Sequence, residues 1–284
     1  MNTDKKATPV WFITGCSTGL GRALAERVLL NGQRCVATAR NPAQIANIVA
    51  AYPDTALAIG LDVTDARQRQ DAVARAEKAF GRIDMLVNNA GHGYSAAVEE
   101  GDDSAIRPMF ETNFFALAAM TRLVLPGMRS RGSGHIVNIS SIGGLVGNPA
   151  SGYYNATKFA VEGLSQALAK EVGPLGIRVS LIEPGPFRTD FQGRSMTSAA
   201  KPIDAYAETA GARRTQLKAS SGKQPGDPVR AADAIIKVVE SADPPLHLVL
   251  GRNGVQRVRE ALQEVLRSVD EWESVSLGAD FPAS

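Results

Sequence analysis

Residues 134–158 of the chain are GHIVNISSIGGLVGNPASGYYNATK. The segment 135–139 (HIVNI) predicts a buried strand, and the residues from Tyr154 onward predict a helix. Tyr154 and Lys158 are four residues apart, which places both side chains on one face of that helix. A phenol ordinarily loses its proton near pH ~10, and a nearby lysine ammonium lowers that pKa. Ser141 stands 13 residues before Tyr154, at the exit of the strand. The three side chains together predict a proton relay and an oxygen clamp that interconvert a carbonyl and an alcohol.

A glycine-rich loop lies near the start of the chain, directly after the apolar run 10–14 (VWFIT). That run is typical of a fully buried parallel strand, and residues 20–32 predict a helix that ends near Gly32. The loop N–H groups and the helix dipole attract a pyrophosphate. A tight turn without a ligand is the alternative for this loop taken alone. The residues expected to hold a cofactor are Gly15, Ser17, Thr18, Gly19, Leu20 and Gly21.

Short apolar runs alternate with helical segments along most of the chain, which is typical of α/β domains with a parallel sheet. We expect one doubly wound, Rossmann-type parallel sheet of about seven strands with helices on both faces. Residues 1–8 are expected to form a tail, and residues 9–284 a single catalytic domain. The expected strands are 10–14, 34–39, 56–61, 85–87, 135–139, 177–182 and 247–250.

Several short motifs occur in a fixed order between about Val10 and Gly251. They are the glycine loop, Asp62-Val63, Asn88-Asn89-Ala90-Gly91, Asn113, Ser141, Tyr154, Lys158 and Pro184-Gly185. In this combination the chain resembles the short-chain dehydrogenase/reductase family. Residues 143–163 are also similar, more loosely, to members that act on hydroxysteroids and retinoids.

The resemblance implies a nicotinamide-dependent oxidoreductase and assigns roles to the matching positions. Asn113 would hold a water that bridges toward the active-site lysine, and Lys158 would also hold the nicotinamide ribose. The remaining cofactor contacts are expected at Asp62 and Val63 near the adenine, Asn89, Ala90 and Gly91 beside the adenosine ribose, and Pro184, Gly185 and Thr189 near the nicotinamide.

The end of the second predicted strand indicates which nicotinamide cofactor is used. An acidic side chain at this position would bind the 2′-hydroxyl of NAD, but the chain has Ala39 there, followed by Arg40. A guanidinium pairs well with a phosphate. We therefore expect NADP(H); a solvated surface arginine is the alternative reading of Arg40.

Two segments beyond the motifs have less regular patterns. Residues 191–227 show few periodic runs, and we expect a substrate lid over about 187–227, or else a solvent-exposed insertion without a role. Residues 254–272 carry an amphipathic stripe of a helix. We expect this stripe to pack on the chain's own core, with a subunit interface as the alternative.

Composition excludes several classes of protein. The 284 residues are 44% hydrophobic and 21% charged, and the net charge of +2 gives no reason to expect nucleic acid or an anionic membrane as a partner. No apolar run is long enough for a signal peptide or a membrane span. Cys16 and Cys35 are the only cysteines, and nothing suggests an oxidising compartment, so we expect a cytoplasmic protein. The histidines, His92, His135 and His247, have no metal-like spacing, and we expect no metal site.

The expected partners are a small-molecule carbonyl or alcohol substrate, NADP(H), and further copies of the chain in a homodimer or homotetramer. Two other functions stay open. One is an isomerase or dehydratase of the extended branch, which recycles a tightly held cofactor. The other is a non-catalytic NADP-binding regulator on the same fold, which would have no need of the serine, tyrosine and lysine together.

Overall fold

The computed structural model describes residues 8–281, and its central element is a seven-stranded sheet in which every neighbouring pair is parallel. The strand order is β3-β2-β1-β4-β6-β7-β9, so the expected doubly wound sheet is confirmed. Because the order reverses beside β1, the carboxyl ends of β1 and β4 lie next to a topological switch point. The strands are β1 (Val10–Ile13), β2 (Arg34–Ala39), β3 (Ala56–Gly60), β4 (Met85–Asn88), β6 (Gly134–Ile139), β7 (Ile177–Pro184) and β9 (His247–Leu250).

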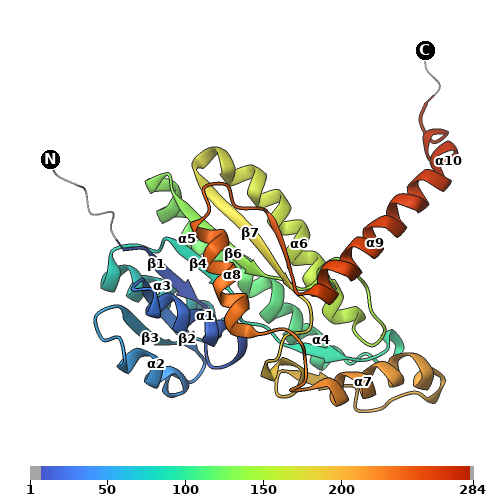
Figure 1. The fold of residues 1–284 in the computed structure, drawn as a ribbon, viewed down its shortest axis with the longest axis horizontal. Coiled ribbons are helices and arrows are strands. Elements are labelled where there is room, and N and C mark those ends of the chain that lie inside the picture. Colours follow the sequence, from blue (N-terminus) through green and yellow to red (C-terminus); the bar gives the residue numbers. More distant parts are fainter. Residues whose placement is uncertain (1–7, 282–284) are drawn as a thin grey trace.

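Helices cover both faces of the sheet (Figure 1). On one face α1 (Gly19–Leu30), α2 (Ala46–Ala50) and α8 (Pro228–Glu240) bury their apolar sides in a single core cluster. On the other face α3 (Ala66–Phe80), α5 (Ala116–Arg131) and α6 (Gly152–Val172) do the same. Both faces of the sheet are therefore buried under helices, which explains why its strands do not alternate between apolar and polar residues.

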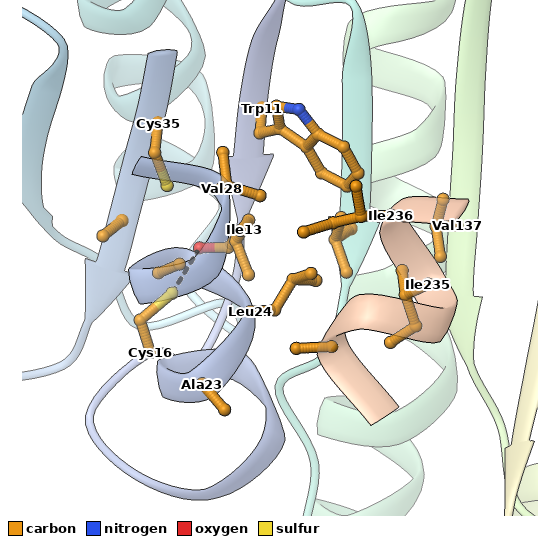
Figure 2. Close-up of a cluster of buried hydrophobic side chains, with 14 of the residues drawn as sticks. Trp11, Ile13, Cys16, Ala23, Leu24, Val28, Cys35, Val137, Ile235 and Ile236 are labelled. Atoms are coloured by element: carbon orange, nitrogen blue, oxygen red, sulfur yellow. Dashed lines mark hydrogen bonds between the residues drawn. The ribbon is translucent and has the colours of Figure 1, made fainter. Parts of the chain in front are cut away.

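Figure 2 shows the first of these clusters, where Leu24 and Val28 of α1 meet Ile235 and Ile236 of α8 beneath Trp11. Both cysteines belong to this cluster and both are free thiols. Burial raises the pKa of Cys16 to about 12, so this thiol stays protonated and unreactive at neutral pH.

The long helical region after β4 is not broken at Pro108, although a proline in a helix interior usually kinks or breaks the helix. Pro108 lies inside α4 (Asp103–Phe110), and the irregular turn comes later, as a π-helical segment at Glu111–Phe115 that runs straight into α5. Asn113 sits at the centre of this wide turn. Such π segments are rare and frequently occur at functional sites.

The expected lid contains more regular structure than its sequence suggests. Met196–Ser198 forms a short strand, β8, that pairs in parallel with β5 (Gly93–Ser95), and Ala212–Ser220 forms helix α7. The sequence prediction of a segment with little structure is wrong here, because α7 has no buried residue and so lacks an apolar periodicity. A polar helix gives no hydrophobic pattern to detect.

The C-terminal stripe does not pack on the core, which corrects the preferred reading of the sequence. Helix α9 (Arg252–Glu271) and the short α10 (Glu273–Leu277) project away from the body of the molecule (Figure 1). Only Gly254 and Val258 of α9 are buried. Within residues 8–281 no helix combines the length and the apolar composition needed to cross a membrane.

Candidate active site

A cavity of about 1540 Å³ lies along the carboxyl ends of the sheet strands, and it gathers residues from distant parts of the chain. Its size exceeds that of a typical small-ligand pocket, so it can accommodate a dinucleotide together with a substrate. Of the residues selected from the sequence, Gly21 and Asn113 do not line it. The selected residues that do line it are Gly15, Ser17, Thr18, Gly19, Leu20, Arg40, Asp62, Val63, Asn89, Ala90, Gly91, Ser141, Tyr154, Lys158, Pro184, Gly185 and Thr189.

The glycine loop is shaped to receive an anion at the start of α1. Thr18 is the N-cap of this helix, but its side chain makes no capping hydrogen bond, so the first N–H groups are left for a ligand. The amide of Asn89 holds the loop by donating to the carbonyls of Thr14 at 2.8 Å and Gly15 at 3.0 Å. A Cβ on Gly21 would lie 2.3 Å from that amide nitrogen, so glycine is required there for packing and not for ligand contact.

The end of the cavity next to β2 and β3 is formed by Ala39, Arg40, Asp62 and Val63. Arg40 is exposed, and within residues 8–281 its guanidinium has no hydrogen-bonding or ion-pairing partner, which leaves it free for an anionic group. The Asp62 carboxylate accepts hydrogen bonds from the backbone N–H and the hydroxyl of Thr64, at 2.9 and 2.7 Å. Asp62 also stands four residues before helix α3 and is one candidate for the cap of that helix.

The cap of that helix is supplied by another residue. Asp65 accepts from the N–H groups of Arg67 and Gln68 at 2.8 and 3.0 Å. Asp62 therefore shapes the turn beside the cavity, and its capping role is excluded.

The expected catalytic side chains converge on one wall of the cavity. The Ser141 hydroxyl oxygen and a ring carbon of Tyr154 both lie 3.4 Å from the position that a Cβ on Gly143 would take. Ser141 accepts a hydrogen bond of 3.0 Å from the N–H of Gly143, which fixes the hydroxyl orientation. The Lys158 ammonium lies 5.9 Å from the centre of the Tyr154 ring and donates to the carbonyl of Ile139 at 2.8 Å.

The charge states of this wall differ from the sequence expectation. Burial raises the pKa of Tyr154 to about 12, and only the hydrogen bond with Ser141 opposes the shift. Burial lowers the pKa of Lys158 to about 8, with the charge of Glu162 acting in the opposite direction. Burial therefore outweighs the lowering of the tyrosine pKa that was expected from Lys158. The phenol is desolvated, and the ammonium is directed to a backbone carbonyl instead of the phenol oxygen.

Asn113 is held by three hydrogen bonds that use both atoms of its amide. Its oxygen accepts from the N–H of His92 at 3.0 Å, and its nitrogen donates to the carbonyl of His92 at 2.8 Å and to the hydroxyl of Thr157 at 3.1 Å. The side chain therefore joins the segment after β4 to the helix that carries Tyr154 and Lys158. This positioning role accounts for a buried asparagine in mid-helix; the expected water contact stays a prediction.

Residues of the expected lid also contact the site. The ring of Phe191 packs against Tyr154 with a centroid distance of 5.6 Å. Arg194 donates a hydrogen bond of 2.9 Å to the hydroxyl of Thr18 in the glycine loop. The lid is anchored by Arg214, which forms an ion pair with the fully buried carboxylate of Glu100. The contacts of Arg194 and Arg214 join residues more than 100 positions apart, so no local pattern indicates them.

A cluster of three titratable side chains lies close to the cavity wall that carries Ser141, Tyr154 and Lys158. His247 Nδ1 lies 2.6 Å from a carboxylate oxygen of Glu183 and 3.6 Å from one of Glu162. Both carboxylates are buried, and burial raises the pKa of each to about 7, so the two groups share a proton near neutral pH. The sequence predicted no metal site, yet these three side chains place potential ligand atoms within 4.8 Å of one another. The ammonium of Lys158, one helical turn away, disfavours a cation there.

Comparison with known proteins agrees with this geometry. The family model described as short chain dehydrogenase matches residues 9–199. The oxidoreductase BOA17 of Botryotinia fuckeliana is 39% identical, over 96% of this chain and 99% of that protein. A 3-ketodihydrosphingosine reductase of Bacteroides thetaiotaomicron is 35% identical over 84% of this chain and 87% of its own. Human retinol dehydrogenase 8 is 34% identical over 83% of this chain and 79% of its own.

Solved structures show the same fold. The crystal structure of a short-chain dehydrogenase from Streptomyces avermitilis superposes with a TM-score of 0.91, at 43% identity over 97% of this chain and all of the other. A Burkholderia phymatum protein in complex with NAD has a TM-score of 0.78 at 24% identity over 98% of both chains. A metagenomic oxidoreductase in complex with NADP has a TM-score of 0.66 at 25% identity, over 85% of this chain and 96% of its own. Similar folds therefore bind either cofactor.

Proposed function

The chain belongs to the short-chain dehydrogenase family, and from this membership we propose that it transfers a hydride between NADP(H) and the carbonyl or alcohol group of a hydrophobic small molecule. The observation that carries the proposal is the convergence of Ser141, Tyr154 and Lys158 on the cavity that the glycine loop also lines. Ser141 follows β6, whereas Tyr154 and Lys158 lie on α6, and the chemistry of the three side chains is useful only in combination.

In the proposed reaction Tyr154 donates its phenol proton to the substrate oxygen, and the Ser141 hydroxyl orients that oxygen by a hydrogen bond. The nicotinamide, when bound, supplies or accepts the hydride. Lys158 would hold the nicotinamide ribose, and its positive charge favours the phenolate that remains after proton donation. The phenol of Tyr154 is protonated at neutral pH, so it is able to donate its proton to a carbonyl oxygen.

The choice of NADP(H) rests on the end of β2. Arg40 lines the cavity with a free guanidinium, and Ala39 before it offers no carboxylate to a ribose 2′-hydroxyl. The neighbouring Arg22 is already engaged, by Glu26 at 2.9 Å and by the carbonyl of Gln44 at 3.2 Å. Arg40 is therefore the cation at this end of the cavity that remains available to a 2′-phosphate.

A hydrophobic substrate is supported by the lid. Phe191 and Met196 line the cavity beside Tyr154, and Phe187 lines it at the start of the lid. Relatives of this chain include a 3-ketodihydrosphingosine reductase and a retinol dehydrogenase, both named for substrates with long apolar parts. We propose that residues 187–227 close over such a substrate and exclude water from the reacting oxygen.

The proposal also takes the protein to be cytoplasmic and homo-oligomeric. Two free, buried thiols are compatible with a reducing compartment. The extended-branch isomerase or dehydratase differs in one observable: its cofactor would remain bound through gel filtration. A non-catalytic regulator would bind NADPH but turn over no substrate.

The test is a screen of NADPH oxidation against ketones, aldehydes and quinones, including long-chain 3-keto compounds and retinal. We expect turnover of at least one apolar carbonyl, a lower rate with NADH, and loss of turnover in Tyr154→Phe. Binding of NADPH without turnover of any compound, together with unchanged behaviour of Tyr154→Phe, would contradict the proposal.

A further inference from the structure

Helix α9 and helix α10 form an arm with an apolar face that nothing in residues 8–281 covers. Beyond Val258 every large apolar residue of the arm is more than half exposed, from Leu262 at 52% to Leu277 at 65%. A globular protein rarely exposes so continuous an apolar surface unless a partner binds it. The exposed residues are Leu262, Val265, Leu266, Val269, Trp272, Val275 and Leu277.

The spacing of the stripe is that of a two-helix seam. Val258, Leu262, Val265, Val269 and Trp272 follow one another at alternating steps of four and three residues. This repeat of 3.5 residues keeps a single row of side chains directed at one partner helix. The free part of the arm, about residues 259–277, would span roughly 28 Å. A helix of this length is marginal in water without tertiary contacts, so the arm requires a covering surface.

Charge along the arm identifies what covers it. Between residues 252 and 259 there are three arginines and no acidic residue. Between residues 260 and 273 there are five acidic residues and one arginine. The root of the arm is therefore basic and its tip is acidic. A second copy aligned antiparallel places each tip against the other root, whereas a parallel copy would place like charges together.

A second arginine, from outside the arm, adds to the positive charge at the root. Arg257 donates a hydrogen bond to Asn148 at the cavity rim and lies close to Arg213. Burial and the charge of Arg257 both lower the pKa of Arg213. Two guanidinium groups thus lie near each other where the arm leaves the body, and a carboxylate from another chain would relieve their repulsion.

We propose that two copies of this chain dimerise by antiparallel pairing of their arms. In the register that stacks apolar layers, Leu262 lies opposite the partner's Trp272, and Val265 lies opposite the partner's Val269. The same register brings Arg259 beside the partner's Glu273 and places Leu266 next to the two-fold axis, where it meets its own copy. An anionic membrane is the less suitable partner, because the acidic tip would be repelled by it.

The first test is the mass of the assembly in solution, measured by light scattering over a range of concentrations. The variant Val265→Glu with Val269→Glu inserts two charges into the seam, which should weaken association at least ~100-fold and halve the assembly mass. The matched control is Gln263→Glu with Arg267→Glu, which makes the same number of glutamates on the opposite face of the helix. The proposal is overturned if the wild-type chain is monomeric, or if the seam variant keeps the wild-type mass.

The second test fixes the register and orientation. Leu266→Cys should form a disulfide-linked dimer on mild oxidation, whereas Arg267→Cys should not; Cys16 and Cys35 are buried and give no background. Arg259→Glu should weaken the dimer, and Glu273→Arg added to it should restore the association, because the two charges exchange across an antiparallel pair. Failure of the second change to restore association rules out the antiparallel register. Binding of the monomeric chain to anionic phospholipid vesicles, in place of self-association, would also overturn the proposal.

Discussion

Replacement of Arg40 by alanine is expected to weaken NADPH and leave NADH almost unaffected. The guanidinium lines the cavity, makes no polar contact within residues 8–281 that must first be broken, and stands beside Ala39, whose side chain has no polar group to compete. A hydrogen bond to a charged group is worth about 1.5–3 kcal/mol, or roughly 10- to 150-fold in affinity. Because Arg40 is exposed to solvent, screening places the effect in the lower part of that range, about 10- to 30-fold.

The assay is kcat/KM with NADPH and with NADH for the wild type and the variant, with the same substrate. Arg34→Ala is a matched control, since Arg34 lies at the opposite end of the same strand and stacks over Phe80. We expect the control to leave both values within about twofold, because no cofactor group reaches that end of the sheet.

A second substitution extends the prediction. Ala39→Asp added to Arg40→Ala places a carboxylate where it repels a 2′-phosphate and accepts from a 2′-hydroxyl, so the preference should reverse toward NADH. Ala39 is only 3% exposed, and a thermal melt is needed to show that the double variant is folded. Equal loss with both cofactors in Arg40→Ala, or a wild-type preference for NADH, would refute the assignment of NADP(H).

Three further predictions concern the catalytic wall, the buried carboxylates and the lid. Tyr154→Phe should lower kcat by ~10²–10⁴-fold while NADPH still binds. The control Tyr153→Phe should keep most activity, because it removes a hydroxyl that donates to a backbone carbonyl at 2.7 Å outside the cavity. A Tyr154→Phe variant with more than about a tenth of the wild-type kcat would exclude the catalytic role of Tyr154. Burial raises the pKa of Glu162 from 4.5 to about 7, so the folded chain binds the shared proton more tightly than the unfolded chain. The free energy of unfolding should therefore fall as the pH rises from about 4.5 to 7. Glu162→Gln should flatten this pH dependence in denaturant titrations, and an unchanged slope would show that the pair does not titrate in this range. Arg214→Ala leaves the buried carboxylate of Glu100 without its cation, so limited proteolysis should cut within residues 190–227 faster than in the wild type. NADPH together with a substrate analogue should protect this segment, and cleavage only at the chain ends would count against a lid.

The sheet and the cofactor loop were predictable because their signals are local. Residues 10–14 and 135–139 are mostly apolar without a polar-apolar alternation, as expected of strands buried on both faces, and the glycines follow the first strand directly. Tyr154, Lys158 and Ser141 were found because spacing along one strand and one helix determines where these side chains lie. The resemblance to a known family supplied the remaining positions, such as Asp62, which no local rule indicates.

What the sequence did not show depends on contacts between distant segments or on desolvation. The ion pair between Glu100 and Arg214 and the cluster of Glu162, Glu183 and His247 have no periodic signature. The pKa of Tyr154 was predicted to fall, because spacing alone brings the lysine near; burial of the phenol is a property of the folded site, and it acts in the opposite direction. The apolar stripe on α9 was correctly predicted to be helical, but a pattern of apolar residues does not distinguish a core from a second chain.

The wide turn at Glu111–Phe115 restricts how this chain can change in length during evolution. A π turn contains one residue more than the α-helical path it replaces. Deletion of one residue there would restore a regular helix and keep the faces of α4 and α5 in phase, but the wide turn itself would be lost. Asn113, at the centre of that turn, would then lose its hydrogen bonds with the backbone of His92. Homologous chains should therefore gain and lose residues readily in exposed loops but keep a constant count across this helix.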